Sequence, residues 1–259
     1  MNISIVDIRK VETFAFLFQN IKLFTDYINI DCNEERLFIQ TMDSSKISVL
    51  EITIPKTWFC SYSCPIPITF GINSGIFYKI LSSRDKHQQV DITYKMEQED
   101  KLFVHMESLV NTEFDRNFEV PLIDISYEKI MIPVIDYQAD ISLPSLNFAI
   151  LVNQLRGFGE TLEILCNENK IEMISKSLDQ GKMSVPVKID DLSGFAIEEN
   201  KEICMSFSLS NLHLMCFFSK ISKDVEIKLT DNSPLFVAYN NEELTVHFFL
   251  APRISEDVV

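Results

Sequence analysis

The feature that most constrains the fold of this 259-residue chain is an internal repeat. The segment ETFAFLFQNIKLF (12–24) aligns with LNFAILVNQLRGF (146–158), and the shared phenylalanine, alanine and leucine positions lie 134 residues apart (14 to 148). The same offset places Cys-Asn-Glu at 32–34 over Cys-Asn-Glu at 166–168, and no gap separates the two matches. A repeat of half a chain predicts two similar structural units.

The repeat predicts an N-terminal domain over 1–120 and a C-terminal domain over 138–259. Between them the segment 121–137 (PLIDISYEKIMIPVIDY) carries two prolines and several apolar residues, with neither a helical nor a strand period. We interpret it as an interdomain connecting linker. A linker this apolar indicates that it packs against a partner.

Each copy alternates helices with strands. Apolar residues at i, i+3, i+4 and i+7 predict amphipathic helices at 12–24 and 146–158, and a second helix in each copy fits 72–83 and 209–221. The first helix should expose Thr13, Gln19, Asn20 and Lys22. Period-two stretches predict antiparallel strands at 26–31, 37–42, 47–54, 90–96 and 101–107, and at 161–166, 170–175, 182–189, 225–230 and 234–239. The predicted class is α+β, with two similar domains of antiparallel sheets and paired helices.

Composition excludes several function classes. A net charge of −15 argues against a uniformly basic nucleic-acid surface, although a local basic stripe is compatible with it. The six glycines form no phosphate-binding loop or nucleophile elbow, and no apolar run is long enough to span a bilayer. The four histidines and six cysteines lack the spacing of a metal or catalytic site. We therefore expect no enzyme activity, no cofactor, no metal, no membrane association and reduced thiols.

Two further motifs carry a family resemblance. The stretch LFIQTMDSSKISVLEITI (37–54) and the stretch SPLFVAYNNEELTVHFFLAPRI (233–254) resemble the proliferating cell nuclear antigen family, the DNA sliding clamps of eukaryotes and archaea. The resemblance implies the DNA clamp fold, closed as a homotrimer into a pseudo-sixfold ring around duplex DNA. It also implies a non-catalytic DNA polymerase processivity factor and a docking platform for replication and repair proteins. The expected partners are double-stranded DNA, bound without sequence preference, a DNA polymerase, other proteins with a clamp-binding motif, and a clamp loader. The expected location is the nucleus, or a viral replication factory if a virus encodes the chain.

The resemblance also assigns a pocket for partner peptides. Its residues come from three segments and are mostly apolar, which suits an aromatic and aliphatic anchor. Residue type alone would assign these residues to the hydrophobic core. Phe249 stands where the family commonly has tyrosine. The pocket residues are Met42, Lys46, Ile47, Val49, Ile130, Ile132, Pro133, Tyr137, Pro234, Phe249, Ala251 and Pro252.

Basic residues near the helices are the candidates for DNA contact, since a few mobile cations suffice for loose phosphate contact. Any one of them could equally be a solvated helix end. Ala15, Phe16, Ile150, Asn153 and Gly157 stand where the family often has a basic residue, so the hole should be less basic than usual. The candidates are Lys10, Lys22, Lys79, Arg84, Lys86, Arg156, Lys220 and Lys223.

In the family, a strand before the linker pairs with a strand of the next subunit. The corresponding segments are 115–122 and 182–189, which contain Pro121 and Pro186, and proline lacks the amide that a sheet ladder needs. This leaves an alternative open: a clamp-like adaptor, such as a checkpoint-clamp subunit or a divergent viral homologue, that does not form a homotrimer.

Overall fold

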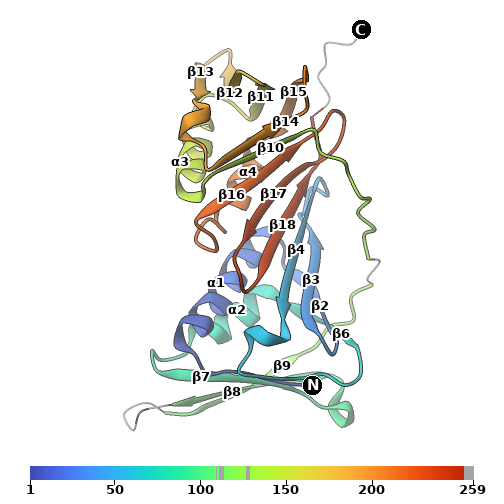
Figure 1. Cartoon of the computed structure of the whole chain (residues 1–259). Coiled ribbons are helices and arrows are strands. Elements are labelled where there is room, and N and C mark those ends of the chain that lie inside the picture. The colour runs from blue at the N-terminus through green and yellow to red at the C-terminus, as the bar shows by residue number, and fades with distance from the viewer. Residues whose placement is uncertain (109, 111–113, 127–128, 254–259) are drawn as a thin grey trace. The chain divides into compact units, whose positions relative to one another are not determined.

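A computed structural model describes residues 1–108, 110, 114–126 and 129–253 of the chain. Residues 127 and 128 of the expected linker, and Ile254 at the end of the LAPRI motif, lie outside the described residues. The chain divides into two compact units (Figure 1). The first unit contains Met1–Ser44, Glu51–Ile130 and Glu242–Thr245. The second contains Ser45–Leu50, Met131–Asn241 and Val246–Val259.

In its described residues the first unit holds two helices and the nine strands β1 to β9, of which β4 belongs to it only from Glu51 onward. One antiparallel sheet has the order β5-β1-β7-β8-β9, and strands β6, β2, β3 and β4 follow one another in a second sheet. Its elements are β1 (Asn2–Ile5), α1 (Ile8–Phe24), β2 (Tyr27–Cys32), β3 (Arg36–Met42), β4 (Ser48–Pro55), the 3-10 turn Lys56–Trp58, β5 (Ser61–Ser63), β6 (Ile68–Asn73), α2 (Ser74–Ser82), β7 (Gln88–Tyr94), the 3-10 turn Met96–Gln98, β8 (Lys101–Ser108) and β9 (Arg116–Pro121).

The second unit repeats this plan. Strands β14, β10, β16, β17 and β18 are neighbours in that order, and a separate antiparallel sheet has the order β13-β12-β11-β15. Its elements are β10 (Ala139–Pro144), α3 (Ser145–Leu155), β11 (Thr161–Asn167), β12 (Lys170–Ser177), β13 (Gly181–Val187), the 3-10 turn Ile189–Asp191, β14 (Gly194–Ile197), β15 (Glu202–Ser208), α4 (Leu209–Cys216), β16 (Asp224–Leu229), β17 (Leu235–Asn240) and β18 (Thr245–Leu250).

Helix α1 follows from its apolar stripe. Asp7 caps the start, its side chain accepting a hydrogen bond from the amide of Arg9 at 2.8 Å. The stripe is buried and packs beside α2, with ring centroids of Phe18 and Phe77 4.6 Å apart. The expectation that Asn20 is exposed is wrong: it is only 6% exposed, and its side-chain amide donates to the carbonyl of Phe16 at 3.0 Å. Bonding to its own helix satisfies the amide and permits this burial.

Helix α4 is shorter than its pattern predicts. Ser208 caps the start, but the helix ends at Cys216 and not at residue 221. The chain then continues in tight turns, in which the amide of Phe218 donates to Met215 at 3.0 Å. These turns bury Phe218 and Ile221. Lys220 therefore lies beyond the helix, although the pattern placed it inside, and Lys223 lies further along the chain.

These elements confirm the expected class, an α+β chain with two similar units of antiparallel sheets and paired helices. None of the helices in the described ranges is long and apolar enough to cross a membrane.

Candidate partner-binding and DNA-contact sites

In the second unit, contacts at the end of β18 connect Ala251 with Ile47, and Tyr137 and Phe249 with Phe236. The amide of Ala251 donates to the carbonyl of Ile47 at 2.9 Å, which fixes the segment after β18 against the MDSSK segment. The Phe236 ring lies 5.9 Å from Tyr137 and 5.3 Å from Phe249, centroid to centroid. Tyr137 before β10 and Phe249 near the end of β18 thus form an apolar cluster on either side of Phe236 in β17. The sequence did not indicate a role for Phe236.

All twelve expected pocket residues are at least partly exposed. Ile47, the most exposed large apolar side chain among them, is 38% exposed. They are therefore not ordinary core. The Tyr137 hydroxyl is buried and has no hydrogen-bond partner in the described part of the chain. Burial raises the pKa of Tyr137 to about 12, so its hydroxyl stays protonated.

In the first unit, Gln40 holds the linker residue Ile130. The Gln40 side chain accepts from the Ile130 amide at 2.8 Å and donates to its carbonyl at 2.9 Å. It also donates to the Glu51 carboxylate at 2.8 Å. Met42 and Ile130 line a pocket of about 410 Å³ beside this contact. Gln40 is 3% exposed and positions the linker, a role that its residue type did not reveal.

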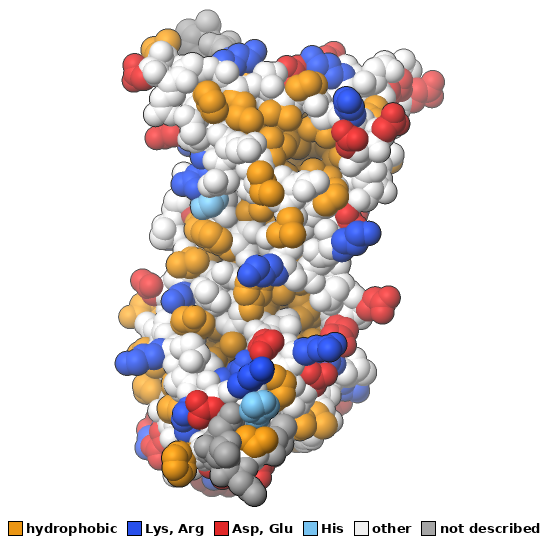
Figure 2. All heavy atoms as spheres, turned by 90° about the vertical axis from the view of Figure 1, so that its left-hand side faces the viewer, with side chains coloured by type: hydrophobic (Ala, Val, Ile, Leu, Met, Phe, Trp, Pro, Cys, Tyr) orange, Lys and Arg blue, Asp and Glu red, His pale blue; other side chains and the backbone are white. Residues whose placement is uncertain are grey.

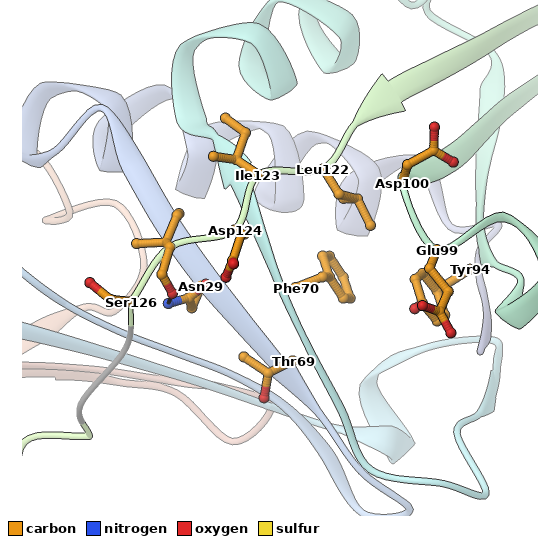
Figure 3. Close-up of a pocket in the computed structure, with 12 residues that line it drawn as sticks. Asn29, Thr69, Phe70, Tyr94, Glu99, Asp100, Leu122, Ile123, Asp124 and Ser126 are labelled. Atoms are coloured by element: carbon orange, nitrogen blue, oxygen red, sulfur yellow. Dashed lines mark hydrogen bonds between the residues drawn. The ribbon is translucent and has the colours of Figure 1, made fainter.

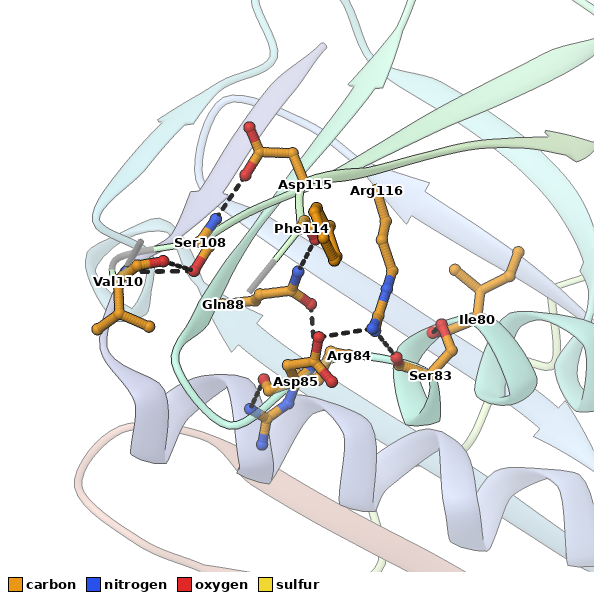
Figure 4. A network of polar contacts seen from close by, with 10 residues as sticks. All are labelled: Ile80, Ser83, Arg84, Asp85, Gln88, Ser108, Val110, Phe114, Asp115 and Arg116. Carbon is orange, nitrogen blue, oxygen red and sulfur yellow. Dashed lines mark hydrogen bonds and ion pairs between the residues drawn. The ribbon is translucent and has the colours of Figure 1, made fainter. Parts of the chain in front are cut away.

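Two of the DNA candidates in the first unit are occupied by internal contacts. Lys10 lies 3.1 Å from the Glu243 carboxylate and donates to the carbonyl of Trp58 at 2.9 Å. Arg84 is 12% exposed, pairs with Glu12 at 3.5 Å and donates to the carbonyl of Asp85 at 3.1 Å (Figure 4). Both side chains act within the fold, so they are poor phosphate ligands.

The other three candidates in the first unit are more accessible. The Lys22 ammonium lies 4.0 Å from the centre of the Tyr78 ring, a cation–π contact that leaves its charge near the helix surface. Lys79 on α2 and Lys86 after it are exposed. These three residues are the cations of the first unit best placed to meet phosphate.

In the second unit, Arg156 is exposed at the end of α3. Burial and then the charge of Arg156 lower the pKa of His213, whose Nδ1 is buried without a hydrogen-bond partner among the described residues. His213 also lies 4.8 Å from the Phe217 ring. Lys220 and Lys223 are exposed in the turns after α4.

Apolar side chains are prominent on the exposed helix faces. Figure 2 shows Lys and Arg side chains scattered over this face, several of them beside Asp or Glu, with many apolar and uncharged side chains between them. Leu23 and Ile76 are 48% and 46% exposed in the first unit, and Leu146 and Ile150 are 59% and 56% exposed in the second. Such faces can make loose, salt-dependent contact with phosphates through a few cations, but they offer no dense basic band.

The two strands expected to join subunits lie at sheet edges. Among the described residues, β9 pairs only with β8 and β13 only with β12. Arg116 of β9 pairs with Asp85 at 2.5 Å and donates to the carbonyl of Ser83 (Figure 4). Pro121 and Pro186 lie within β9 and β13. Each strand presents an outer edge to which another strand can be added.

In the described residues, no group of three or more His, Cys, Asp or Glu side chains has the arrangement of a metal site. All six cysteines are described, and all are free. Burial raises the pKa of Cys32 and Cys216 to about 12 and that of Cys166 to about 11, so these thiols are unreactive.

The fold is shared with a crystal structure of proliferating cellular nuclear antigen from Entamoeba histolytica. The TM-score is 0.86 at 24% identity, over 98% of each chain. Curated relatives include proliferating cell nuclear antigen of Chaetomium thermophilum, 29% identical over 88% of this chain and 90% of the relative. That of Dictyostelium discoideum is 25% identical over 92% and 94%. Proliferating cell nuclear antigen 2 of Drosophila melanogaster is 25% identical over 88% of each chain.

Two family models divide the chain between them. The model for the N-terminal domain of proliferating cell nuclear antigen matches residues 8–129, and the model for its C-terminal domain matches residues 131–254. Together they span nearly the whole sequence, in the order expected from the repeat. The chain belongs to the proliferating cell nuclear antigen family of DNA sliding clamps.

Proposed function

We propose that this chain encircles duplex DNA as a homotrimer, in which it acts as a DNA polymerase processivity factor and docks replication and repair proteins. The observation that carries the proposal is the match of both family domains to the chain. The outer edges of β9 and β13, on which no other described strand pairs, would supply the surfaces that a closed ring needs. The domains would be 1–120 and 138–259, joined by the linker 121–137. The chain would work without catalysis, in the nucleus or in a viral replication factory.

The mass in solution tests the ring. We expect light scattering to give about three times the 29.9 kDa chain mass, independent of dilution over the working range. Phe118→Asp on β9 should reduce this mass to one chain, because a half-buried apolar side chain on the edge becomes charged. The matched control is Phe103→Asp on β8, which is not an edge strand. A native monomer at every concentration would contradict the ring and favour the non-trimeric adaptor.

Partner docking has its own support. Apolar side chains are partly exposed in both units, and exposed apolar patches often mark interaction sites. They are Ile47, Tyr137 and Phe249 in the second unit and Met42 and Ile130 in the first. We propose that the group in each unit provides apolar contacts for anchor residues of partner peptides.

Fluorescence anisotropy with a labelled peptide that carries one aliphatic and two aromatic anchors tests this docking. Ile47→Asp should weaken binding at least tenfold, because a charge would be desolvated against apolar anchors. Leu178→Asp is the control, since Leu178 is a fully exposed apolar residue at the β12–β13 hairpin. Equal affinities for both variants would contradict the assigned docking surface.

DNA contact is proposed to rest on Lys22, Lys79, Lys86 and Arg156, together with Lys220 and Lys223 in the turns between α4 and β16. Because these cations are few, we expect weak binding whose affinity falls as the salt concentration rises. Anisotropy of a labelled duplex between about 50 and 200 mM salt measures the salt slope, which is the change of log affinity with log salt concentration. A slope of zero would contradict direct phosphate contact.

A further inference from the structure

The first unit contains a second pocket, of about 780 Å³, between strand β6, the β7–β8 connection and the start of the linker (Figure 3). Three carboxylates line it: Glu99, Asp100 and Asp124. In the described part of the chain, no ion pair or hydrogen bond engages any of these three carboxylates. The nearby cation Lys101 is paired instead with Glu119 at 2.7 Å. The pocket therefore concentrates negative charge, and no cation among the described residues forms an ion pair with its three carboxylates.

Aromatic and amide groups complete the lining. The rings of Phe70 and Tyr94 are stacked with centroids 6.0 Å apart and planes 7° apart. Asn29 is 6% exposed, and its amide nitrogen reaches the carbonyl of Ile125 at 3.5 Å. Its side-chain oxygen receives no hydrogen bond from any described residue. Figure 3 shows this side chain and the Asp124 carboxylate on the same side of the pocket, so two hydrogen-bond acceptors lie near one another there.

The backbone around the pocket offers few donors of its own. The amide of Leu122 donates to the carbonyl of Asp100 at 2.8 Å, and the amide of Ile123 donates to Gly71 at 2.9 Å. The Thr69 hydroxyl donates to Asp31 at 2.6 Å. A ligand that complements this lining must therefore bring both positive charge and hydrogen-bond donors.

Gly71 fixes the shape of the pocket before any ligand arrives. A Cβ atom at this position would lie 2.2 Å from the carbonyl oxygen of Ile123 and 2.7 Å from the side chain of Ile125. Only glycine lets the linker lie this close to β6. The β-bridge between Gly71 and Ile123 holds the linker in place. Ordering this part of the site on ligand binding therefore costs little free energy.

We propose that this pocket binds the guanidinium group of an arginine supplied by a partner protein. A guanidinium is planar, carries five donors and stacks on aromatic faces, which matches carboxylates, a lone amide oxygen and two parallel rings. The inference rests on the proposed docking function only in taking the arginine from a protein partner. It assigns that partner a contact separate from the apolar anchor residues.

The test uses the short peptide acetyl-Gly-Arg-Gly-amide and the isotope-labelled full chain. In NMR titrations we expect the shifts to centre on the Gly71 and Asp124 amides and the Asn29 side chain. The same peptide with citrulline, which keeps the shape but lacks the charge, should not bind measurably. A lysine peptide should bind at least twofold more weakly than the arginine peptide. Equal binding of either substitute would overturn the assignment to a guanidinium.

Variants locate the site. Asp124→Asn should weaken arginine binding about threefold, and Glu99→Gln combined with Asp124→Asn about tenfold, as expected for exposed ion pairs. Asp179→Asn in the exposed β12–β13 hairpin removes the same charge and should leave binding unchanged. Equal loss in Asp124→Asn and Asp179→Asn would mean that only net charge attracts the peptide, and would overturn the proposal.

The result can be separated from that of anchor docking. Arginine binding without anchor-peptide binding would contradict the docking surface and leave this pocket assigned. Anchor-peptide binding without arginine binding would overturn this inference alone.

Discussion

The linker contact of Gln40 makes a strong prediction about local stability. Gln40→Leu keeps the approximate size of the side chain but removes the amide that bonds both backbone groups of Ile130 at 2.8 and 2.9 Å. Each neutral hydrogen bond contributes about 1 kcal/mol net, so the Ile130 anchor loses about 2 kcal/mol. Because Gln40 is 3% exposed, water does not readily replace the lost amide.

Hydrogen exchange at the Ile130 amide measures this loss directly. A cost of about 2 kcal/mol corresponds to roughly 30-fold faster exchange at this amide. Anchor-peptide binding should weaken as well, since the linker must be ordered again on binding. The control is Gln89→Leu, which removes a comparable bond to Glu107 at 2.7 Å without touching the linker. An Ile130 exchange rate within about threefold of the unmodified chain would refute the reasoning.

Three further predictions concern single side chains. Gly71→Ala should destabilise the first unit by about 1–3 kcal/mol in urea unfolding, because its Cβ would meet the linker carbonyl at 2.2 Å; an unchanged midpoint would contradict this. Burial, and then the charge of Arg156, lower the pKa of His213 below the value of about 6.5 expected in the unfolded chain. The free energy of unfolding therefore keeps its full value above about pH 6.5 and decreases as the pH drops toward the pKa of the folded state. Arg156→Ala should raise that pKa in an NMR titration, and no rise would refute the coupling. Arg84→Ala should lower stability by about 1 kcal/mol yet keep the salt slope of DNA binding, whereas Arg156→Ala should reduce that slope; equal slopes would count against this division.

Local pattern was sufficient for most of the secondary structure. The stripe containing Phe14, Leu17 and Phe18 is buried in α1, and Phe148 and Val152 repeat it in α3. Helical and strand periods depend only on neighbouring residues, so they can be read from the chain itself. The repeat adds the number of units, because each copy needs its own core.

Helix ends and polar burial were harder to predict. Helix α4 stops at Cys216 because the following turns bury Phe218 and Ile221, and no residue in that stretch marks the stop. The helical pattern places Asn20 on the surface, yet the hydrogen bond from its side-chain amide to the carbonyl of Phe16 permits its burial. In both cases the hydrogen bonds are local, but the burial that accompanies them depends on packing against the rest of the unit, which the local pattern does not encode.

The sequence by itself determined the two-unit α+β architecture, the helical and strand positions and the family, since these depend on periodicity and on contiguous motifs. Only the tertiary structure decided which side chains are available for function. Lys10 and Arg84 are occupied by Glu243 and Glu12, while Gln40 holds a linker residue 90 positions away. Contacts between residues that distant leave no signal in local pattern, because folding alone brings their side chains together.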